Sequence, residues 1–322
     1  MSMNVPPPDA SGVAAAVEVE AAGAAGGDVI GEAGPGTIAP LDMRAERRQA
    51  ARERRRLLLR RPGFIVGVII LAFWIVCAVA GDRITPYDPL TPVDTSSLRP
   101  SSDHLMGTDQ VGYDVLSRVM AGARDVLVVA PIAATLSIAL GALLGLVMGY
   151  LRGWVDEILS RLVEVLLSIP VVLMALLITA TLGSSRIVLI GTVAVLFTPI
   201  VTRTVRAAVL SEAQLDYVTS ARLRGENGLF VMTREILPNI RPTILVEFTV
   251  RLGYAVFTVA TLSFLGSGIQ PPSPDWGLAV SDTYFLIPAG QWWPTLFPAL
   301  AIASVVVATN LVADSIEAVL AA

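Results

Sequence analysis

The stretch "GFIVGVIILAFWIVCAVA", residues 63–80, decides the fold class of this 322-residue chain. It holds no charged residue, and its length is close to the roughly 20 residues that a helix needs to cross the hydrocarbon core of a bilayer. In that core only a helix or a closed barrel satisfies its own backbone hydrogen bonds. We therefore expect residues 63–81 to form a first transmembrane helix.

Arginines precede this run and indicate its direction. The segment 44–62, "RAERRQAARERRRLLLRRP", holds nine arginines, and positive charge beside a span keeps that side in the cytoplasm. Residues 1–43 are rich in alanine, glycine and proline and carry too few large apolar side chains to form a core. We interpret 1–43 as a disordered cytoplasmic tail and 44–62 as a basic juxtamembrane segment.

Five further apolar segments are near spanning length. The sequence therefore predicts an all-α integral membrane protein with six transmembrane helices, because each apolar segment must satisfy its own backbone within the bilayer. The five segments are Val126–Tyr150, Val165–Leu182, Ile187–Val201, Ile244–Leu265 and Pro294–Leu311.

The distribution of arginine between the connecting segments predicts that both termini are cytoplasmic. With the N-terminus inside, the inner segments hold 17 arginines and the outer segments hold five, which is the bias that orients membrane proteins. The inner segments are 1–62, 151–164, 202–243 and the C-terminal tail, and the outer ones are 81–125, 183–186 and 266–293.

Composition excludes several classes of chemistry. Hydrophobic residues make up 54% of the chain and charged residues 16%, whereas soluble domains average about 45–50% and about 25%. All 23 basic residues are arginine, so the chain has neither the lysine of an ATP-binding phosphate loop nor a Schiff-base lysine. One cysteine and one histidine argue against an internal disulfide and a His/Cys zinc site.

Glycines recur every four residues in the second apolar segment, at Gly141, Gly145 and Gly149. A repeat of small residues at this spacing suits close packing of membrane helices. The alternative is the ordinary tolerance of membrane helices for glycine.

A polar stretch interrupts the apolar pattern. "YVTSARLRGENGLFVMTREILPN", residues 217–239, interleaves apolar residues with arginines and glutamates. Gly225 lowers helix propensity by about 1 kcal/mol relative to alanine, and Pro238 ends the second half. We expect two short helices with a bend at Gly225. The unit either protrudes towards a partner or lies on the membrane surface as a connection.

This stretch resembles the cytoplasmic loop of ABC importer permeases in its peptide/nickel (Dpp/Opp) form. The family's loop begins with a Glu-Ala-Ala triplet, has a glycine four residues later and closes with Ile-x-Pro. Thr219, Ser220 and Ala221 occupy the triplet here, so its glutamate is missing, while Gly225 and Ile236-Leu237-Pro238 match.

Three other segments agree with that family, and the resemblance covers about residues 62–315. It indicates the "C"-type subunit, with six spans and an extra loop after the first. The segments are "HLMGTDQVGYDVLSRVMAGAR" at 104–124, "LSFLGSGIQPPSPDWG" at 262–277 and "NLVAD" at 310–314.

The resemblance implies a type I ABC importer (MetI-like) permease fold in a bacterial plasma membrane. It divides the chain beyond residue 62 into the first span 63–81, an extracytoplasmic loop 82–125 and a core permease domain 126–315 that contains a cytoplasmic coupling loop 202–243. The implied partners are a second permease subunit, two ATPase subunits or one fused ATPase, and an extracytoplasmic substrate-binding protein. ATP and Mg²⁺ then belong to the ATPase, this chain is no enzyme and needs no cofactor or metal, and no nucleic acid takes part.

Candidate functional residues fall into three groups. Glu247 and Arg251, four residues apart in the fifth span, form an ion pair, or contact the partner permease or a polar pathway. In the extracytoplasmic loop His104 and Asp109 orient the loop or contact substrate, and Trp276, Trp292 and Trp293 lie at the membrane interface or contact the binding protein. The ATPase-coupling candidates implied by the resemblance are Tyr217, Ala221, Gly225, Leu229, Ile236 and Pro238, and those of the extracytoplasmic loop are His104, Gly107, Asp109, Asp114 and Trp276.

Other functions remain open at this level. A secondary transporter is expected to show inverted repeats and intramembrane carboxylates, and a membrane enzyme would need a nucleophile with partners. Within the resembled family the substrate is a dipeptide, an oligopeptide, nickel or haem.

The arginine count predicts the topology in a testable form. With Cys77 replaced, a cysteine at Ser96 or Ser273 is expected to react with an impermeant reagent added to intact cells, and a cysteine at Asn227 is not. Labelling of the Asn227 position from outside would contradict six spans with the N-terminus inside.

Overall fold

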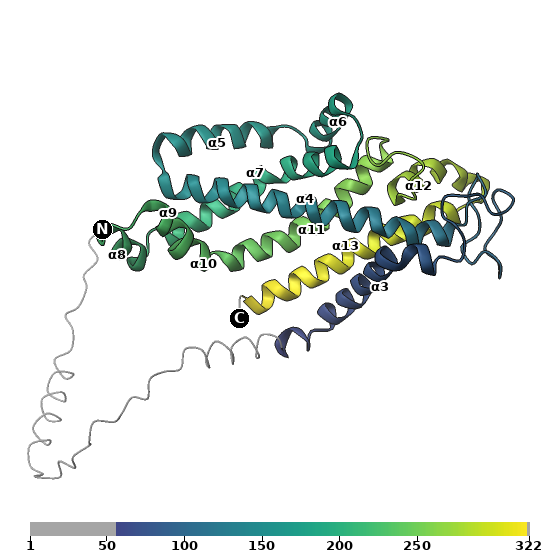
Figure 1. Ribbon diagram of the computed structural model, residues 1–322, viewed down its shortest axis with the longest axis horizontal. Helices are drawn as coiled ribbons and strands as arrows, with labels where there is room; N and C mark the ends of the chain where they lie inside the picture. Colours follow the sequence, from purple (N-terminus) through teal and green to yellow (C-terminus); the bar gives the residue numbers. More distant parts are fainter. Residues whose placement is uncertain (1–55, 321–322) are drawn as a thin grey trace, which may run out of the picture. The chain divides into compact units, whose positions relative to one another are not determined.

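The computed structural model describes residues 56–320, and in this range the chain folds into helices joined by loops (Figure 1). The only strand-like pairing within the described range is a single β-bridge between Thr108 and Asp114. The predicted tail 1–43 and most of the basic segment 44–62 lie outside the described residues.

Within residues 56–320, five helices are long and apolar enough to cross a membrane, and a bent pair makes a sixth crossing if it is counted as one span. The all-α prediction with six spans is therefore confirmed at this level. The five helices are α3 (Pro62–Ile84), α4 (Val115–Leu151), α7 (Arg186–Glu212), α11 (Arg241–Phe264) and α13 (Trp293–Leu320), and the bent pair is α5 (Gly153–Ser168) with α6 (Val171–Leu182).

Most of these helices run past the apolar segments that predicted them. Helix α4 begins at Val115 because the Asp114 side chain accepts a hydrogen bond from the backbone N–H of Ser117 (2.8 Å) and caps the helix. Helix α7 continues to Glu212, so residues 202–212 of the predicted cytoplasmic loop are still helical. Apolar length marks the part of a helix suited to lipid, and the helix itself ends where its backbone hydrogen bonds stop.

The third expected span, Val165–Leu182, is not one continuous helix. Helices α5 and α6 meet at a bend of 92°, and Pro170 lies between them. Proline has no N–H to donate and forces the preceding residue out of the helical region, and Ile169 is extended at φ −89° and ψ 128°. The sequence prediction of an unbroken span is wrong at this point.

Shorter elements connect the long helices at opposite ends of the bundle (Figure 1). Figure 1 shows α8, α9 and α10 at one end and α12 at the other, beside the loop of residues 85–114. After the roles that the resemblance implies, we call residues 217–239 the coupling segment and residues 85–114 the outer loop. The short elements are α8 (Asp216–Leu223), α9 (Gly228–Phe230), the π-helical turn η1 (Val231–Ile236), α10 (Leu237–Asn239), α12 (Trp276–Thr283) and the 3₁₀ helix η2 (Tyr284–Ala289).

Glycines bring α4 and α7 into close backbone contact. A Cβ at Gly145 would lie 2.8 Å from the carbonyl oxygen of Thr202, and a Cβ at Gly149 would lie 2.7 Å from Cβ of Val209. Real Cβ atoms do not approach neighbouring atoms so closely. The small-residue repeat is therefore a packing surface, and ordinary glycine tolerance does not explain it.

Buried apolar side chains form two clusters. The larger one joins α3, α4, α7, α11, α12 and α13 and includes Trp74, Val129 and Trp276. The smaller one lies where α4 and α7 meet the coupling segment and includes Val205, Val209, Val218, Ala221, Val231 and Ile236. The coupling segment is thus packed onto two long helices by its own apolar core.

Replacing Gly145 tests the α4–α7 contact. We expect Gly145→Ala to force the two backbones apart and to cost about 1–3 kcal/mol, as overpacking does, which lowers the melting temperature in detergent. Gly191→Ala on α7 is the matched control, because its Cβ would meet nothing within 4 Å, and alanine favours the helix by up to about 1 kcal/mol. Equal melting temperatures for the two variants would contradict this account of the glycine repeat.

Candidate functional site

The coupling segment bends at Gly225, as the sequence predicted. Helix α8 ends at Leu223, and Gly225 has φ +77°, a left-handed conformation that glycine adopts at little cost. The N–H of Gly225 donates to the carbonyl of Arg222 (3.0 Å), and the N–H of Glu226 donates to the carbonyl of Ala221 (3.2 Å). These bonds close the end of α8 and turn the chain towards α9.

Two sets of apolar residues in the segment have opposite roles. Ala221 and Ile236 are fully buried, in the cluster that also holds Val205 and Val209 of α7. Leu223 is 84% exposed and Leu229 is 63% exposed. Of the coupling candidates, Ala221 and Ile236 are therefore not free to contact a partner, and they support the segment from beneath.

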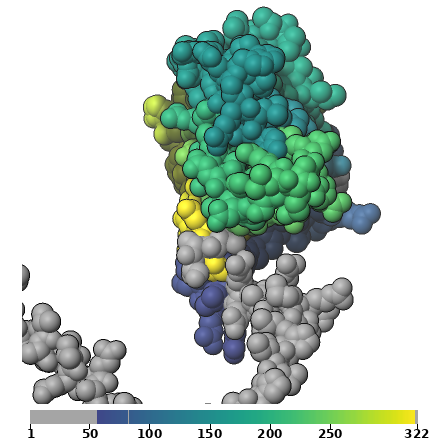
Figure 2. Space-filling view, turned by 90° about the vertical axis from the view of Figure 1, so that its left-hand side faces the viewer, coloured from purple at the N-terminus to yellow at the C-terminus, as the bar shows by residue number. Residues whose placement is uncertain are grey.

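The exposed set includes two residues that sequence reasoning did not select. Leu223 lies between Arg222 and Arg224, and the aromatic side chain of Phe230, next to Leu229, is 42% exposed. We call Leu223, Leu229 and Phe230 the apolar tip. An apolar residue between two arginines was a signal for Leu223 that could have been used. Figure 2 shows the segment, in green, as a continuous surface at this end of the bundle.

Tyr217 ties the two ends of the coupling segment together. Its hydroxyl donates to Oε1 of Glu212 (2.6 Å) at the end of α7 and accepts from Nδ2 of Asn239 (2.9 Å) in α10. Burial and the hydrogen bond to Glu212 raise the pKa of Tyr217 to about 12. The hydroxyl therefore keeps its proton and remains a donor at every physiological pH.

Tyr150 connects the segment to α4. The guanidinium of Arg222 lies 4.8 Å from the centroid of the Tyr150 ring, within the range of a cation–π contact. A Cβ at Gly228 would lie 3.1 Å from Cε1 of the same ring. The sequence showed Tyr150 only as the last residue of an apolar segment and gave no sign of this contact.

A charged pair joins α5 and α7 near this end. Nε and Nη2 of Arg206 each donate to one oxygen of Asp156, both at 2.6 Å. Such a two-pronged pair fixes the geometry as well as the distance. Neither residue was among the predicted site residues, because the two lie 50 positions apart in the sequence.

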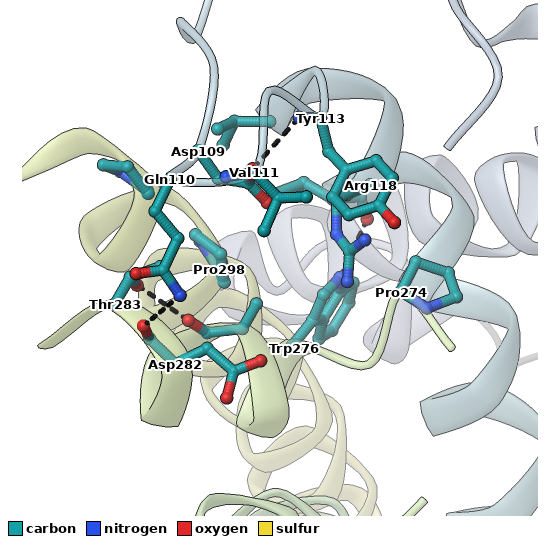
Figure 3. A pocket seen from close by; sticks show the side chains of 14 residues that line it. Asp109, Gln110, Val111, Tyr113, Arg118, Pro274, Trp276, Asp282, Thr283 and Pro298 are labelled. Atoms are coloured by element: carbon teal, nitrogen blue, oxygen red, sulfur yellow. Dashed lines mark hydrogen bonds between the residues drawn. The ribbon is translucent and has the colours of Figure 1, made fainter. Parts of the chain in front are cut away.

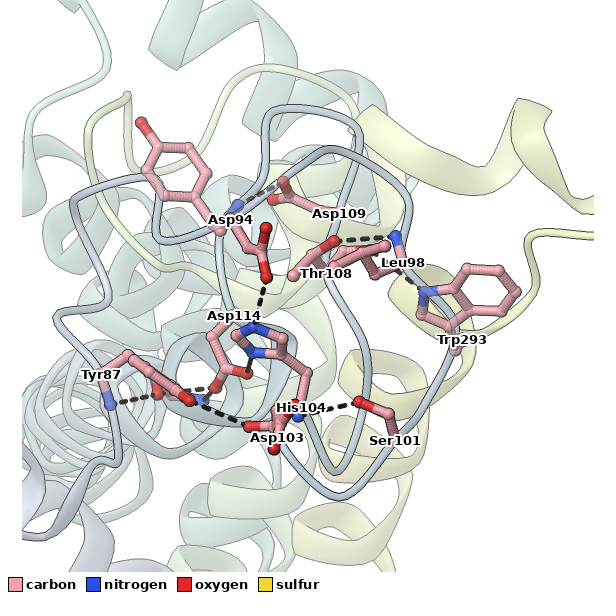
Figure 4. A network of polar contacts seen from close by, with 12 residues as sticks. Tyr87, Asp94, Leu98, Ser101, Asp103, His104, Thr108, Asp109, Asp114 and Trp293 are labelled. Carbon is pink, nitrogen blue, oxygen red and sulfur yellow. Dashed lines mark hydrogen bonds and ion pairs between the residues drawn. The ribbon is translucent and has the colours of Figure 1, made fainter.

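The predicted residues of the outer loop hold that loop in shape (Figure 4). His104 is 4% exposed, and its Nδ1 lies 2.9 Å from Oδ1 of Asp114. The other oxygen of Asp114 caps α4 through Ser117. The Tyr87 ring lies against the imidazole, with centroids 4.9 Å apart. These contacts match the orienting interpretation of His104.

Asp109 and Gly107 shape the same loop. Oδ1 of Asp109 accepts hydrogen bonds from the backbone N–H groups of Val111, Gly112 and Tyr113 at 2.9 to 3.0 Å. Gly107 has φ +73°, and a Cβ there would lie 2.7 Å from Nε1 of Trp293. That indole donates to the carbonyl of Thr108 (3.1 Å). The loop is therefore anchored to the start of α13.

Trp276 is not at the membrane interface, and that expectation is wrong. The side chain is fully buried, its Nε1 donates to the carbonyl of Val119 (2.8 Å), and its ring lies 4.7 Å from that of Trp74. A tryptophan whose N–H finds a partner is stable inside a core. Trp293 is also buried, whereas Trp292 is 46% exposed.

A small cavity lies above Trp276, between the outer loop, α4 and α12 (Figure 3). It has a volume of about 60 Å³, and both apolar and polar residues line it. Nε2 of Gln110 donates to the carbonyl of Asp282 (3.0 Å), and the Arg118 guanidinium lies 4.6 Å from the Tyr113 ring centroid. The Gln110–Asp282 hydrogen bond at the edge of the cavity joins the outer loop to α12.

Glu247 and Arg251 meet inside α11. Nε of Arg251 donates to Oε2 of Glu247 (2.9 Å), and the side chains of Arg251 and Glu247 are 12% and 13% exposed. The guanidinium also lies 5.3 Å from the Tyr254 ring centroid. Two opposite charges in contact reduce the cost of placing each of them in a spanning helix.

In the described residues, the long apolar helices define a multi-pass α-helical membrane protein, and the polar coupling segment connects two of them, α7 and α11. The family described as "Binding-protein-dependent transport system inner membrane component" matches residues 141–322, more than half of the chain. The chain belongs to this family. It is a membrane permease component, so neither enzymatic activity nor a cofactor is expected of it.

Curated relatives agree over most of their length. The chain is 39% identical over 269 residues to the "Dipeptide transport system permease protein DppC" of Escherichia coli K12, which covers 80% of this chain and 88% of the relative. It is 37% identical over 267 residues to a "Putative peptide transport system permease protein" of Brucella suis (82% and 89% covered). It is 34% identical over 262 residues to the "Di/tripeptide transport system permease protein DppC" of Pseudomonas aeruginosa (79% and 86% covered).

Asp275, the residue directly before α12, has a buried carboxylate. Oδ1 of Asp275 accepts from the N–H of Leu278 (2.9 Å) and caps the helix. Burial raises the pKa of Asp275 to about 6, although the hydrogen bond from Leu278 opposes the shift. Because this pKa lies above the usual value of about 3.9 for an unfolded chain, the protonated form favours folding. That contribution is lost as the pH rises through about 6.

Asp275→Asn tests this assignment. Asparagine also caps helices but does not titrate, so we expect the variant to lose less stability than the wild type between about pH 4 and about pH 7. The measurement is the melting temperature in detergent across that range. Asp88→Asn, at an exposed carboxylate, is expected to keep the wild-type pH dependence. A wild-type slope in Asp275→Asn would contradict the titration of a buried carboxylate here.

Proposed function

We propose that this chain is one of two permease subunits of an ABC importer that takes up dipeptides or oligopeptides. Membership of the binding-protein-dependent transport family supports the importer, and the peptide permeases among its relatives support the substrate class. Nickel or haem remains the second candidate, since the sequence motifs belong to a family that includes both substrates.

ATP hydrolysis is assigned to other subunits. This chain has no lysine for a phosphate loop, so ATP and Mg²⁺ belong to two ATPase subunits or one fused ATPase. An extracytoplasmic binding protein delivers the substrate, and the second permease completes the pathway across the bilayer. No role for nucleic acid follows from any of these features.

The observation that carries the proposal is the division of the coupling segment into a buried support and an exposed apolar tip. Leu223 is 84% exposed beside a cluster in which Val218 and Ala221 are fully buried. A well-supported apolar projection is the kind of surface that seats in a partner's hollow. We assign the apolar tip to contact with the ATPase.

Two contacts then carry movement of the tip into the spanning helices. Tyr217 joins both ends of the segment to the end of α7, and Tyr150 joins its centre to the end of α4. Because α4 and α7 are in close contact through glycines, a shift of the segment reaches both helices together. ATP-driven closure of the ATPase pair would thereby bias the bundle between inward-open and outward-open arrangements.

We assign the outer loop to the extracytoplasmic side of the membrane, opposite the ATPase. The loop is held in shape, because the side chains of His104, Asp109 and Asp114 form hydrogen bonds to other residues of the chain. Its exposed apolar residues include Leu105, at 65% exposure. We propose that this loop and Trp292 meet the substrate-binding protein.

A double substitution at the apolar tip tests the coupling role. We expect Leu223→Gln with Leu229→Gln to leave expression and melting temperature close to wild type, because both side chains are exposed, and to weaken ATPase association by at least about tenfold, as for the loss of two anchor residues. The measurements are ATPase association, substrate-stimulated hydrolysis and uptake in a reconstituted complex. Leu105→Gln, a similarly exposed leucine on the outer loop, is the matched control for ATPase association.

The substitution Gly225→Val is a second test of the coupling role of residues 217–239. Valine at φ +77° is strained, so the bend should shift while every spanning helix is unchanged. We expect assembly or substrate stimulation to fall together with uptake. Normal uptake and stimulation in both the Leu223/Leu229 double variant and Gly225→Val would contradict the coupling role. Uptake without any ATPase subunit would favour a secondary transporter.

A further inference from the structure

A groove between α3 and α4 combines an apolar wall with two arginines. Its volume is about 630 Å³, and its apolar wall includes Ile75, Val79, Leu127 and Val128. Arg83, in the last turn of α3, and Arg124, on α4, both line the same groove. Neither arginine lies within the coupling segment (217–239) or the outer loop (85–114).

The apolar wall belongs to surfaces that face away from the core. On α4 the exposed residues follow one face of the helix, at Val128, Ile132, Leu136, Leu140 and Leu143, and Arg124 lies one turn before Val128 on the same face. On α3 Val79 is 84% exposed, whereas Trp74 and Cys77 point into the core. The groove is therefore open to the hydrocarbon of the bilayer.

The arginines lie at the level of the lipid headgroups. Arg124 precedes Tyr150 by 26 residues of one helix, or roughly 39 Å at 1.5 Å per residue, and the hydrocarbon core is about 30 Å thick. Arg83 follows Gly81, where the candidate span of α3 ends. Arg83 thus lies just beyond the candidate span of α3, and Arg124 lies two residues before the apolar segment Val126–Tyr150 of α4. Both are at the end of the bundle that carries the outer loop.

We propose that this groove binds one anionic phospholipid. Its phosphate lies between Arg83 and Arg124, and an acyl chain lies against Val79 and Val128. Guanidinium groups bind phosphate oxygens in pairs of parallel hydrogen bonds. Arg124 also makes a contact within the chain, and its five N–H donors allow both.

The charge of the site selects the kind of lipid. Arginine close to a membrane surface contributes about 1 kcal/mol of attraction to anionic lipid. A zwitterionic lipid offers the same phosphate, but it adds a cationic group that the two arginines repel. A helix of a partner permease could cover the apolar wall, and it would need an acidic group to meet the arginines.

Native mass spectrometry of the assembled complex tests the proposal. The complex is titrated in detergent with phosphatidylglycerol or with phosphatidylcholine of the same acyl chains. We expect phosphatidylglycerol to bind at least about tenfold more tightly and to raise the melting temperature. Arg83→Gln and Arg124→Gln should each remove most of this preference.

Control measurements separate the alternatives. Arg161→Gln, at a guanidinium that is 75% exposed on α5, should keep the wild-type preference. Glycerol 3-phosphate in excess should not displace the lipid. If Arg124→Gln does not fold, Arg83→Gln alone decides the outcome.

Three results would overturn the proposal. The first is an unchanged lipid preference in Arg83→Gln. The second is displacement by glycerol 3-phosphate, which would make the groove a site for soluble anions. The third is retention of phosphatidylglycerol by the isolated chain but not by the complex, which would assign the groove to the partner permease.

Discussion

The close backbone contact between α4 and α7 is the constraint on which the rest of the described structure depends. In a bilayer, apolar side chains gain little by leaving lipid for protein, so helices associate through close packing. The glycines at 141, 145 and 149 supply that closeness, since any Cβ there would collide with α7. The two helices then form one rigid pair, and the coupling segment packs against the end of this pair.

The buried cluster beneath the coupling segment depends on this pair of helices, because both α4 and α7 contribute residues to it. Val205 and Val209 of α7 lie in one buried cluster with Val218 and Ala221 of the segment, and burying a valine side chain away from water contributes about 1.5–3 kcal/mol. Polar contacts then fix the orientation: Tyr217 spans the base of the segment, and Arg222 lies over Tyr150. This short, largely polar stretch is held in place by a small buried cluster that it shares with α4 and α7.

The sequence predicted the features that depend on local pattern and failed where distant residues meet. Apolar length located the spanning helices, and Gly225 located the bend, because both are properties of neighbouring residues. The break at Pro170 was also readable, but apolar length was given more weight than proline. By contrast, Arg206 and Asp156, or Tyr150 and Arg222, become neighbours only through the fold. Trp276 was misplaced for the same reason: its partner, the carbonyl of Val119, is 157 residues away.

The separation of support from tip has an evolutionary consequence. A substitution at a buried position such as Ala221 or Ile236 is expected to affect folding, whereas exchange of an exposed side chain such as Leu223 usually changes stability by no more than about 0.5 kcal/mol. If the tip contacts the ATPase as proposed, it can change in step with the ATPase while the buried residues beneath it are retained. Under that proposal, gene duplication yields permeases that share one architecture and pair with different ATPases.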